Sequence, residues 1–211
     1  SLPPGATYDH IVSNTAMATV TNTATWTGAD SAGGFAVNDT IPYNFEDISG
    51  TGTAVPLGDD EVSLALPMGF TFDYFGVNYT DAYISSNGFL TFLPGQSNGC
   101  CSGQPIPTAG SPDAIIAAWW EDLYPPGGGS IQYQTLGVAP NRYFIAQYTN
   151  LPHFSSGNPV TMQVKLFEGT NVIEVHYQDA PSDSGTHSAG VENETGTVGV
   201  QYVLQSTGLV T

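Results

Sequence analysis

Two stretches decide the fold of this chain: YISSNGFLTF at residues 83–92 and IIAAWWEDLY at residues 115–124. They contain the densest apolar and aromatic clusters in the sequence. In the first stretch, Asn87-Gly88 separates two β-prone runs, and both residues tolerate a positive φ, so the pair predicts a β-hairpin with a type I′ turn. In the second stretch, the apolar run stops at Glu121-Asp122 and is followed by the breakers Pro125-Pro126 and Gly127–Gly129.

Short apolar runs continue outward from these stretches. From Ile41 onward they recur at intervals of about eight to twelve residues, the spacing of an all-β sandwich or barrel. The other candidate strands are 43–48, 62–66, 70–75, 81–85, 89–93, 131–134, 143–149, 160–167, 172–177 and 198–204.

The run 160–167 has the cleanest strand pattern. Its even-numbered residues are apolar and predict an inward face, whereas Thr161, Gln163 and Lys165 predict an outward face. Because only the polar turn 168–171 separates it from the run 172–177, the two runs should form an antiparallel hairpin.

The N-terminal part differs in composition. Residues 8–26 alternate small or apolar residues with threonines, which indicates a strand, and TGADSAGG at 27–34 has the composition of a flexible linker. We therefore expect an extended strand and Gly-rich linker over residues 1–34, followed by a single antiparallel β-sandwich, jelly-roll-like, over residues 35–211. The strand can complete its own sandwich or pair with the open edge of a neighbouring molecule.

Charge and composition exclude several classes of protein. Of 211 residues, 40% are hydrophobic, which is typical of a globular chain, and two basic residues face nineteen acidic ones for a net charge of -17. Nucleic acids and anionic membranes repel such a chain. No stretch approaches the roughly eighteen apolar residues of a membrane span. The chain opens SLPP with neither Met nor an apolar leader, as a secreted chain does after signal-peptide removal and as a trimmed chain does.

The two cysteines, Cys100 and Cys101, are neighbours in the sequence. Consecutive Cα atoms lie about 3.8 Å apart across a trans peptide, which is shorter than the usual disulfide span. Three states stay open: a vicinal disulfide, free thiols or an inter-chain bridge. A cytosolic location would favour the free thiols.

The segment 113–123 is ambiguous. Its apolar residues also fit one stripe of a helix, and periodicity alone does not separate a buried strand from a buried helix here. The residues of that stripe are Ile115, Ile116, Trp119, Trp120 and Leu123.

Several motifs in one order resemble those of a known family. They are EDISGTGTAVPLGDDEVSLALPMGFTFDYFGVNYT at 46–80, ISSNGFLTF at 84–92, NGCCSGQPIP at 98–107, IIAAWWEDLYP at 115–125, GVAPNRYF at 137–144, VKLFEGTNVIEVHY at 164–177 and AGVENETGTVGVQY at 189–202. The chain resembles bacterial secreted β-sandwich modules that are related in pattern to the nidogen-type extracellular domain. This resemblance implies that IIAAWW is a core strand. It also implies an extracellular, mostly non-catalytic module with no fixed ligand, of the kind found in adhesins, in matrix-type proteins or beside secreted hydrolases.

The residues do not favour an enzyme. There is no G-x-S-x-G elbow, no H-E-x-x-H and no Gly-rich phosphate loop, and the four histidines are dispersed. Glu121 and Asp122 are neighbours on an expected strand and would point to opposite faces, unlike a glycosidase pair. A carboxylate at the end of a buried strand needs a partner. We therefore expect a structural ion pair between Arg142 and Glu121 or Asp122.

Three further sets of residues are candidate sites. Asp59, Asp60 and Glu61 form the densest acidic run and are a calcium candidate, although they lack the spaced pattern of a dedicated calcium loop and fit an exposed turn better. If Trp119 and Trp120 lie on a strand, one fills the core. The other is either covered by the cysteine-bearing loop or forms a sugar-stacking platform with Tyr124. N-glycosylation patterns occur at Asn38, Asn78 and Asn193.

The resulting hypothesis is a non-catalytic extracellular or cell-surface module that acts in adhesion or self-assembly and requires no cofactor. In its sharper form, residues 8–26 are donated to a neighbouring copy and link subunits into a fibre. The alternative is a carbohydrate- or ligand-binding accessory module of a secreted hydrolase. The expected partners are other copies of the chain or an extracellular glycan.

Overall fold

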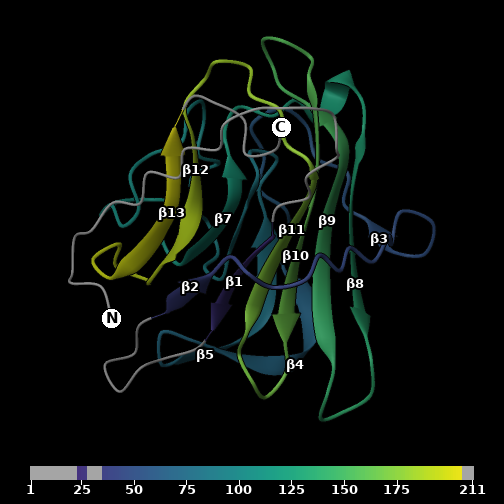
Figure 1. Cartoon of the computed structure of the whole chain (residues 1–211), viewed down its shortest axis with the longest axis vertical. Helices are drawn as coiled ribbons and strands as arrows, with labels where there is room; N and C mark the ends of the chain where they lie inside the picture. Colours follow the sequence, from purple (N-terminus) through teal and green to yellow (C-terminus); the bar gives the residue numbers. More distant parts are fainter. Residues whose placement is uncertain (1–22, 28–34, 206–211) are drawn as a thin grey trace.

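The structure, a computed structural model, describes residues 23–27 and 35–205 and confirms an antiparallel β-sandwich. Two sheets face each other (Figure 1). The seven-stranded sheet has the order β2-β1-β11-β10-β9-β8-β3 and the six-stranded sheet the order β13-β12-β7-β6-β5-β4. No helix in these ranges is long and apolar enough to cross a membrane.

The strands of the seven-stranded sheet are β1 (Thr23–Thr27), β2 (Ala36–Asn38), β3 (Thr53–Ala54), β8 (Ser130–Leu136), β9 (Tyr143–Pro152), β10 (Pro159–Phe167) and β11 (Ile173–Asp179). Those of the six-stranded sheet are β4 (Leu66–Tyr74), β5 (Val77–Ile84), β6 (Phe89–Thr91), β7 (Ile115–Trp120), β12 (His187–Glu192) and β13 (Gly199–Gln205). Within the described ranges, a 3-10 turn, η1 (Pro125–Gly127), falls at the predicted breakers.

The core between the sheets is aromatic, and its tyrosines connect the two layers. Tyr148 on β9 donates its hydroxyl proton to the carbonyl of Ser85 at 2.9 Å, and Tyr177 on β11 donates to Ala118 on β7 at 2.6 Å. A buried hydroxyl needs such a partner. The bond from Tyr177 fixes β7 against the opposite sheet, and the bond from Tyr148 does the same for the end of β5.

The hairpin predicted at Asn87-Gly88 is present between β5 and β6, but the predicted turn type is wrong. Ile84 pairs with Leu90, the Ser85 amide donates to the Phe89 carbonyl at 2.9 Å, and of the two turn residues only Gly88 has a positive φ, +79°. The loop therefore has three residues, 86–88, with Gly88 in the left-handed region. Asn87 instead uses its side chain, which donates to Asp60 at 2.7 Å and accepts from the Leu123 amide at 3.1 Å.

The segment IIAAWW is strand β7, as expected from the resemblance, and all six of its residues are buried. It lies between β6 and β12, and both of its faces are covered. Trp119 packs in the core between the sheets, whereas Trp120 packs in a second cluster with Phe89 and Ile106. A strand covered on both faces loses the polar alternation that distinguishes it from a helix.

The hairpin β10–β11 is confirmed, but the outward face predicted for β10 is not exposed to solvent. Gln163 and Lys165 are 0% and 1% exposed because residues 43–48, predicted as a strand, cross this face without pairing as one. Figure 1 shows this segment running across β11, β10 and β9 toward β3. We call residues 43–48 the strap.

Side chains of the sheet take the place of a partner strand for the strap. Gln163 accepts from the Glu46 amide at 3.1 Å and donates to the Glu46 carbonyl at 2.6 Å. Gln147 accepts from the Ile48 amide at 2.9 Å, and Lys165 donates to the Asn44 carbonyl at 2.7 Å. The polar face of β10 is therefore a binding surface for the backbone of the chain itself.

Part of the predicted N-terminal strand is described. Residues 23–27 form β1, which pairs with β11 from Thr23↔His176 to Trp26↔Ile173 and with β2 on its other side. The rest of the prediction, residues 8–22, lies outside the described residues.

Candidate functional site

Two polar arrangements are built around the end of β7. The disulfide loop, residues 94–113, covers the Trp120 side of the strand. The Glu121 cluster, defined as Glu121, His153, Asp183 and His187, lies on the Trp119 side. Alternation along β7 sends the two indoles, and the loops packed on them, to opposite sides.

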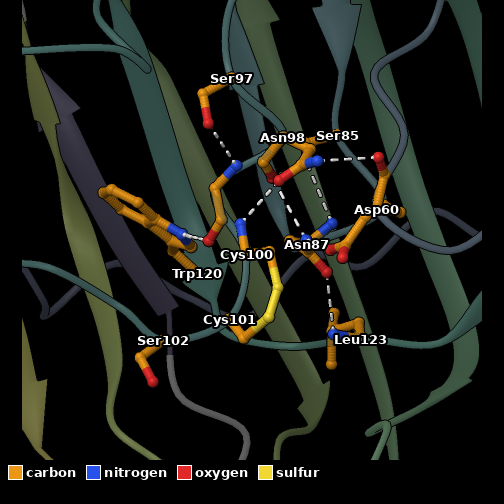
Figure 2. The surroundings of a disulfide bond; sticks show 12 residues. Asp60, Ser85, Asn87, Ser97, Asn98, Cys100, Cys101, Ser102, Trp120 and Leu123 are labelled. Carbon is orange, nitrogen blue, oxygen red and sulfur yellow. Dashed lines mark hydrogen bonds between the residues drawn. A yellow bond between two sulfur atoms is a disulfide. The ribbon is translucent and has the colours of Figure 1, made fainter.

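In the disulfide loop, Cys100 and Cys101 form the vicinal disulfide, one of the three states left open by the sequence. The indole N–H of Trp120, which is labelled in Figure 2, donates to the carbonyl of Gly99 at 2.7 Å. Asn98 accepts from the Cys100 amide at 2.8 Å and donates to the Asp60 carbonyl at 2.9 Å. The loop is thus a cover over Trp120.

The predicted sugar-stacking platform does not form. Trp119 and Trp120 are 0% and 4% exposed, so neither indole face is open to a sugar. Tyr124 is partly exposed and packs against Phe154, with ring centroids 5.1 Å apart. Burial under the disulfide loop, one of the two outcomes foreseen for the second tryptophan, is the one observed.

Glu192 on β12 anchors the far end of the loop. It is 1% exposed and accepts from the Thr108 amide at 2.9 Å. Burial raises the pKa of its carboxyl to about 7, the charge of Asp113 adds to the rise, and the bond from Thr108 opposes it. A carboxyl with a raised pKa holds its proton more tightly in the folded state. The contribution of Glu192 to stability is therefore fully present below the pKa of the unfolded state, near 4.5, and is lost as the pH rises through the folded pKa of about 7.

We accordingly predict that Glu192→Gln flattens this part of the pH profile. The amide remains neutral and still accepts from Thr108, so at pH 8 the variant should be more stable than the parent by about 2 kcal/mol, with little difference at pH 4. Urea unfolding at both pH values measures this. Glu194→Gln, which removes an exposed acid two residues along, is the control and should leave the pH profile of the parent unchanged. An equal gain at pH 4 and pH 8 would contradict the assignment.

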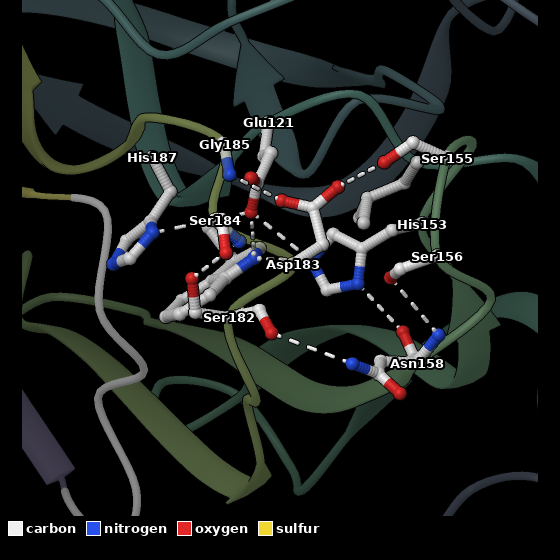
Figure 3. Close-up of polar contacts among 12 residues, drawn as sticks. Glu121, His153, Ser155, Ser156, Asn158, Ser182, Asp183, Ser184, Gly185 and His187 are labelled. Atoms are coloured by element: carbon white, nitrogen blue, oxygen red, sulfur yellow. Dashed lines mark hydrogen bonds and ion pairs between the residues drawn. The ribbon is translucent and has the colours of Figure 1, made fainter.

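The Glu121 cluster is assembled from three separate connections (Figure 3). Glu121 directly follows β7, His153 follows β9, and Asp183 lies between β11 and β12. Glu121 Oε2 is 3.0 Å from His153 Nε2, and one ligand atom from each of Glu121, His153 and Asp183 lies within 4.8 Å of the other two. Glu121 is 2% exposed and His153 1%.

The protonation of this cluster follows from its burial and its hydrogen bonds. Burial raises the pKa of Glu121, its contact with Asp183 acts in the same direction, and its bond with His153 opposes the rise. Burial also raises the pKa of Asp183, but bonds with Glu121, Ser155 and Gly185 outweigh this and bring it to about 2. Burial lowers the pKa of His153, but its bond to Glu121 and its bond to the backbone reverse this into a net rise. The cluster therefore retains protons while Asp183 stays ionised.

His187 completes the cluster. Its ring stacks on Trp119 with centroids 3.7 Å apart, and Nδ1 lies 3.9 Å from Glu121 Oε2. Neither ring nitrogen has a hydrogen-bond partner among the described residues, and the residue is fully buried. Burial lowers the pKa of His187 to about 4, and a repulsive contribution from His153 adds to this.

The predicted ion pair of Arg142 with Glu121 or Asp122 is wrong. Arg142 binds Glu168 through two contacts, at 2.5 and 2.8 Å, and also donates to the Gly69 carbonyl. Arg142 precedes β9, whereas the Glu121 cluster lies at the other end of that strand, roughly 30 Å away for a ten-residue strand. The register Phe167↔Tyr143 instead brings Glu168 beside Arg142, and His153 takes the place next to Glu121.

The acidic run 59–61 does not converge on a common point. The Asp60 carboxylate accepts from Asn87, and the Glu61 carboxylate accepts from the Gly58 amide at 2.6 Å. In the described part of the chain, the sets of three or more potential ligands are the Glu121 set and Asp60 and Asp122 with the two cysteines. Calcium binding at residues 59–61 stays a prediction.

The predicted glycosylation positions differ in accessibility. Asn38 and Asn78 are exposed, whereas the side-chain oxygen Oδ1 of Asn193 accepts from the amides of Thr197 and Val198 within a turn. Glycosylation stays a prediction.

The sequence analysis did not predict that the four titratable residues of the Glu121 cluster lie together. No motif spacing connects positions 121, 153 and 183, because each lies in a different connection between strands, and His187 is the first residue of β12. The one signal in the sequence is the run of polar and turn-forming residues APSDSGTH at 180–187, which contains Asp183 and His187.

A family model described as NIDO related matches residues 34–211, and this family is not a known catalytic one. No solved structure matches the chain. The match covers every described strand except β1, together with the disulfide loop and the Glu121 cluster, and the chain therefore belongs to the NIDO-related family.

Proposed function

We propose that the chain is a non-catalytic structural module of the extracellular space or cell surface that acts in adhesion or self-assembly. Its membership in the NIDO-related family supports the extracellular part, because a nidogen-type domain suggests that context. The disulfide between Cys100 and Cys101 agrees with it, since disulfides persist in oxidising compartments.

The burial of the titratable cluster supports a non-catalytic role. Glu121, His153 and His187 are 2%, 1% and 0% exposed. A general acid or base must come within hydrogen-bond reach of a substrate, and these groups are closed off by their own loops. The chain then acts through its surface and its sheet edges.

The observation that carries self-assembly is the position of β1. Four consecutive Cα pairs join Thr23–Trp26 to residues 173–176 of β11, so a segment from the start of the chain completes a sheet built from its far half. Backbone hydrogen bonds of this kind are the same whichever copy supplies the strand. We propose that residues 8–26 pair in this way with a neighbouring copy, with the Gly-rich stretch 27–34 as the joint, and so link subunits head to tail.

Thiol trapping across this pair tests the proposal. Thr25 and Glu174 are Cα partners, and a Thr25→Cys/Glu174→Cys variant should be oxidised into a bridge. Strand donation predicts a ladder of covalent oligomers on a non-reducing gel, because the bridge then joins two copies. The matched control is Ser130→Cys/Thr149→Cys, which joins the partners of a hairpin within one sheet and should give only monomers.

If the gel shows only bridged monomers, at every protein concentration and in native preparations, strand donation is rejected. The proposal of an extracellular structural module does not depend on strand donation and would stand after that result. Electron microscopy of the native material provides the independent readout, since a head-to-tail chain of subunits appears there as a filament.

A shallow groove supports the alternative, a ligand-binding module. It has a volume of about 700 Å³ and runs beside the disulfide loop. Its polar lining includes Asp60, Glu61, Ser63, Tyr83, Gln96 and Asn98. Hydroxyl, amide and carboxylate groups around a tyrosine ring suit a sugar. Glycan binding here with a strictly monomeric chain would favour this function over self-assembly.

A further inference from the structure

The Glu121 cluster contains more hydrogen-bond acceptors than donors. His153 Nδ1 lies 2.6 Å from the Asn158 carbonyl, which only accepts, so Nδ1 carries a proton and a neutral ring presents the lone pair of Nε2 to the cluster. That nitrogen lies 3.0 Å from Glu121 Oε2, which is also an acceptor. The Trp119 indole N–H is shared between His153 Nε2, at 3.2 Å, and Glu121 Oε2, at 3.0 Å.

The two carboxyl groups add to this excess. Glu121 Oε1 is buried and has no donor facing it. A Cβ at Gly185 would meet both this oxygen and Asp183 Oδ1, so the absence of a side chain there lets the two carboxyl groups approach. The Asp183 carboxylate already accepts from Ser155 and from the Gly185 amide, both at 2.6 Å. Neither cation of the chain is near, because Arg142 binds Glu168 and Lys165 binds the strap.

His187 is an independent indication of a missing partner. Both of its ring nitrogens are buried without a hydrogen bond, which costs free energy unless something is bound. Its Nδ1 is directed at the cluster, as the dashed line from His187 in Figure 3 shows, and lies 3.9 Å from Glu121 Oε2. Stacking on Trp119 holds the ring in that orientation.

We propose that Glu121, His153, Asp183 and His187 form a closed structural site for a divalent transition metal ion of the zinc class. Zn–N and Zn–O bonds of about 2.0–2.2 Å place neighbouring tetrahedral ligands roughly 3.3 Å apart. The observed separations of 3.0 Å and 3.9 Å from Glu121 Oε2 lie on either side of that value. Two carboxylates neutralise the ion, and two imidazoles favour zinc over calcium, which takes oxygen ligands.

The surroundings match those of a metal site. A metal-ligating histidine usually donates its other ring N–H to a carbonyl or carboxylate, and His153 does this to Asn158. Ser155 and Gly185 orient the Asp183 carboxylate in the same way. With the metal on His153 Nε2, the Trp119 N–H donates to Glu121 alone. The ion would join the end of β7 to the connections that follow β9 and β11, and it would enter beside Asp183, the most exposed of the four ligands.

Zinc binding to the parent chain is the first measurement. The full chain, stripped with a chelator and with its disulfide intact, should take up one zinc ion per chain by elemental analysis and calorimetry. At a free zinc concentration of about one hundred times Kd, the melting temperature should rise by roughly 5–10 °C. Calcium and magnesium at the same concentration should change neither readout. Cobalt in place of zinc should give the visible absorption of a tetrahedral site.

Variants locate the ion. His153→Gln should weaken zinc binding at least about 100-fold, and His187→Gln should weaken it and alter the cobalt spectrum. His176→Gln is the matched control, because it removes another buried histidine that binds a glutamate, Glu174 at 2.9 Å, and it lies on β11, outside the Glu121 cluster. Asp60→Asn/Asp122→Asn removes the carboxylates of the other cluster. Both controls should bind zinc like the parent.

Three results would overturn the proposal. One is a parent chain that takes up no stoichiometric zinc and melts at the same temperature with and without it, as expected if protons alone hold the cluster together. Another is zinc binding that survives His153→Gln. The third is binding lost in Asp60→Asn/Asp122→Asn, which would place the ion beside the cysteines. If His153→Gln does not fold, the measurement on the parent chain and His187→Gln still decide the question.

Discussion

Gly88→Ala should lower the free energy of unfolding by more than about 4 kcal/mol, enough to prevent folding at 37 °C. A Cβ at this position would overlap the Trp119 carbonyl oxygen and lie 2.7 Å from the carbonyl carbon. The Gly88 carbonyl also accepts from the amides of Ala118 and Trp119, at 3.1 and 3.0 Å, so the turn cannot move away without breaking these bonds. Chemical denaturation, or the soluble yield if the variant does not fold, measures the loss.

Gly76→Ala separates the steric clash from the cost of the backbone conformation. Gly76 has φ +82°, close to the +79° of Gly88, but nothing lies within 4 Å of a Cβ there. Its substitution should cost only the left-handed penalty of about 1–2 kcal/mol. Equal losses in the two variants would show that contact with β7 is not what requires glycine at position 88.

Gln163→Leu should destabilise the chain by about 2–4 kcal/mol, because it leaves several polar groups without partners. The amide of Gln163 binds both the N–H and the carbonyl of Glu46 and donates to Gln147 at 2.9 Å. Leucine fills a similar volume but serves none of them. Urea unfolding gives the change in stability, and hydrogen exchange of the Glu46 and Ile48 amides should show the strap released before global unfolding.

Gln134→Leu is the matched control for that prediction. Gln134 is a partly exposed glutamine on β8 of the same sheet, and it accepts one hydrogen bond, from Thr51 at 2.8 Å. Water can replace this bond, so the change should be small, within about 1 kcal/mol. A loss as large as that of Gln163→Leu would mean that glutamine is needed for strand pairing in general and not for holding the strap.

Local patterns succeeded where one local interaction dominates. The hairpins at 84–90 and 166–173 follow from turn residues and β-prone flanks, which act over a few positions. Strand β12, HSAGVE, was not anticipated, because it lies buried between β7 and β13 and its small residues carry no alternation. The strap was predicted as a strand for the opposite reason, since its composition favours β structure while its hydrogen bonds go to side chains.

In the candidate site, too, local patterns predicted some features and tertiary contacts decided others. Burial of one tryptophan in the core was predicted from alternation along 115–120, and cover of the other by the cysteine-bearing loop was one of the two outcomes that alternation left open. The partner of Glu121 was not predicted. Charge alone suggested Arg142, but strand length and register place that residue at the far end of β9 and bring His153 to the near end.

The order of residues was enough to establish an all-β chain, its family resemblance and its strongest hairpins, because backbone preference and side-chain periodicity are local properties. Which polar residues meet was decided by tertiary structure: Glu121 with His153, Asp183 and His187, and Gln163 with Glu46. The members of each pair are distant in the sequence, and they come together only when two twisted sheets pack at one register. No periodicity in the sequence records that register, since it results from the sum of all strand pairings.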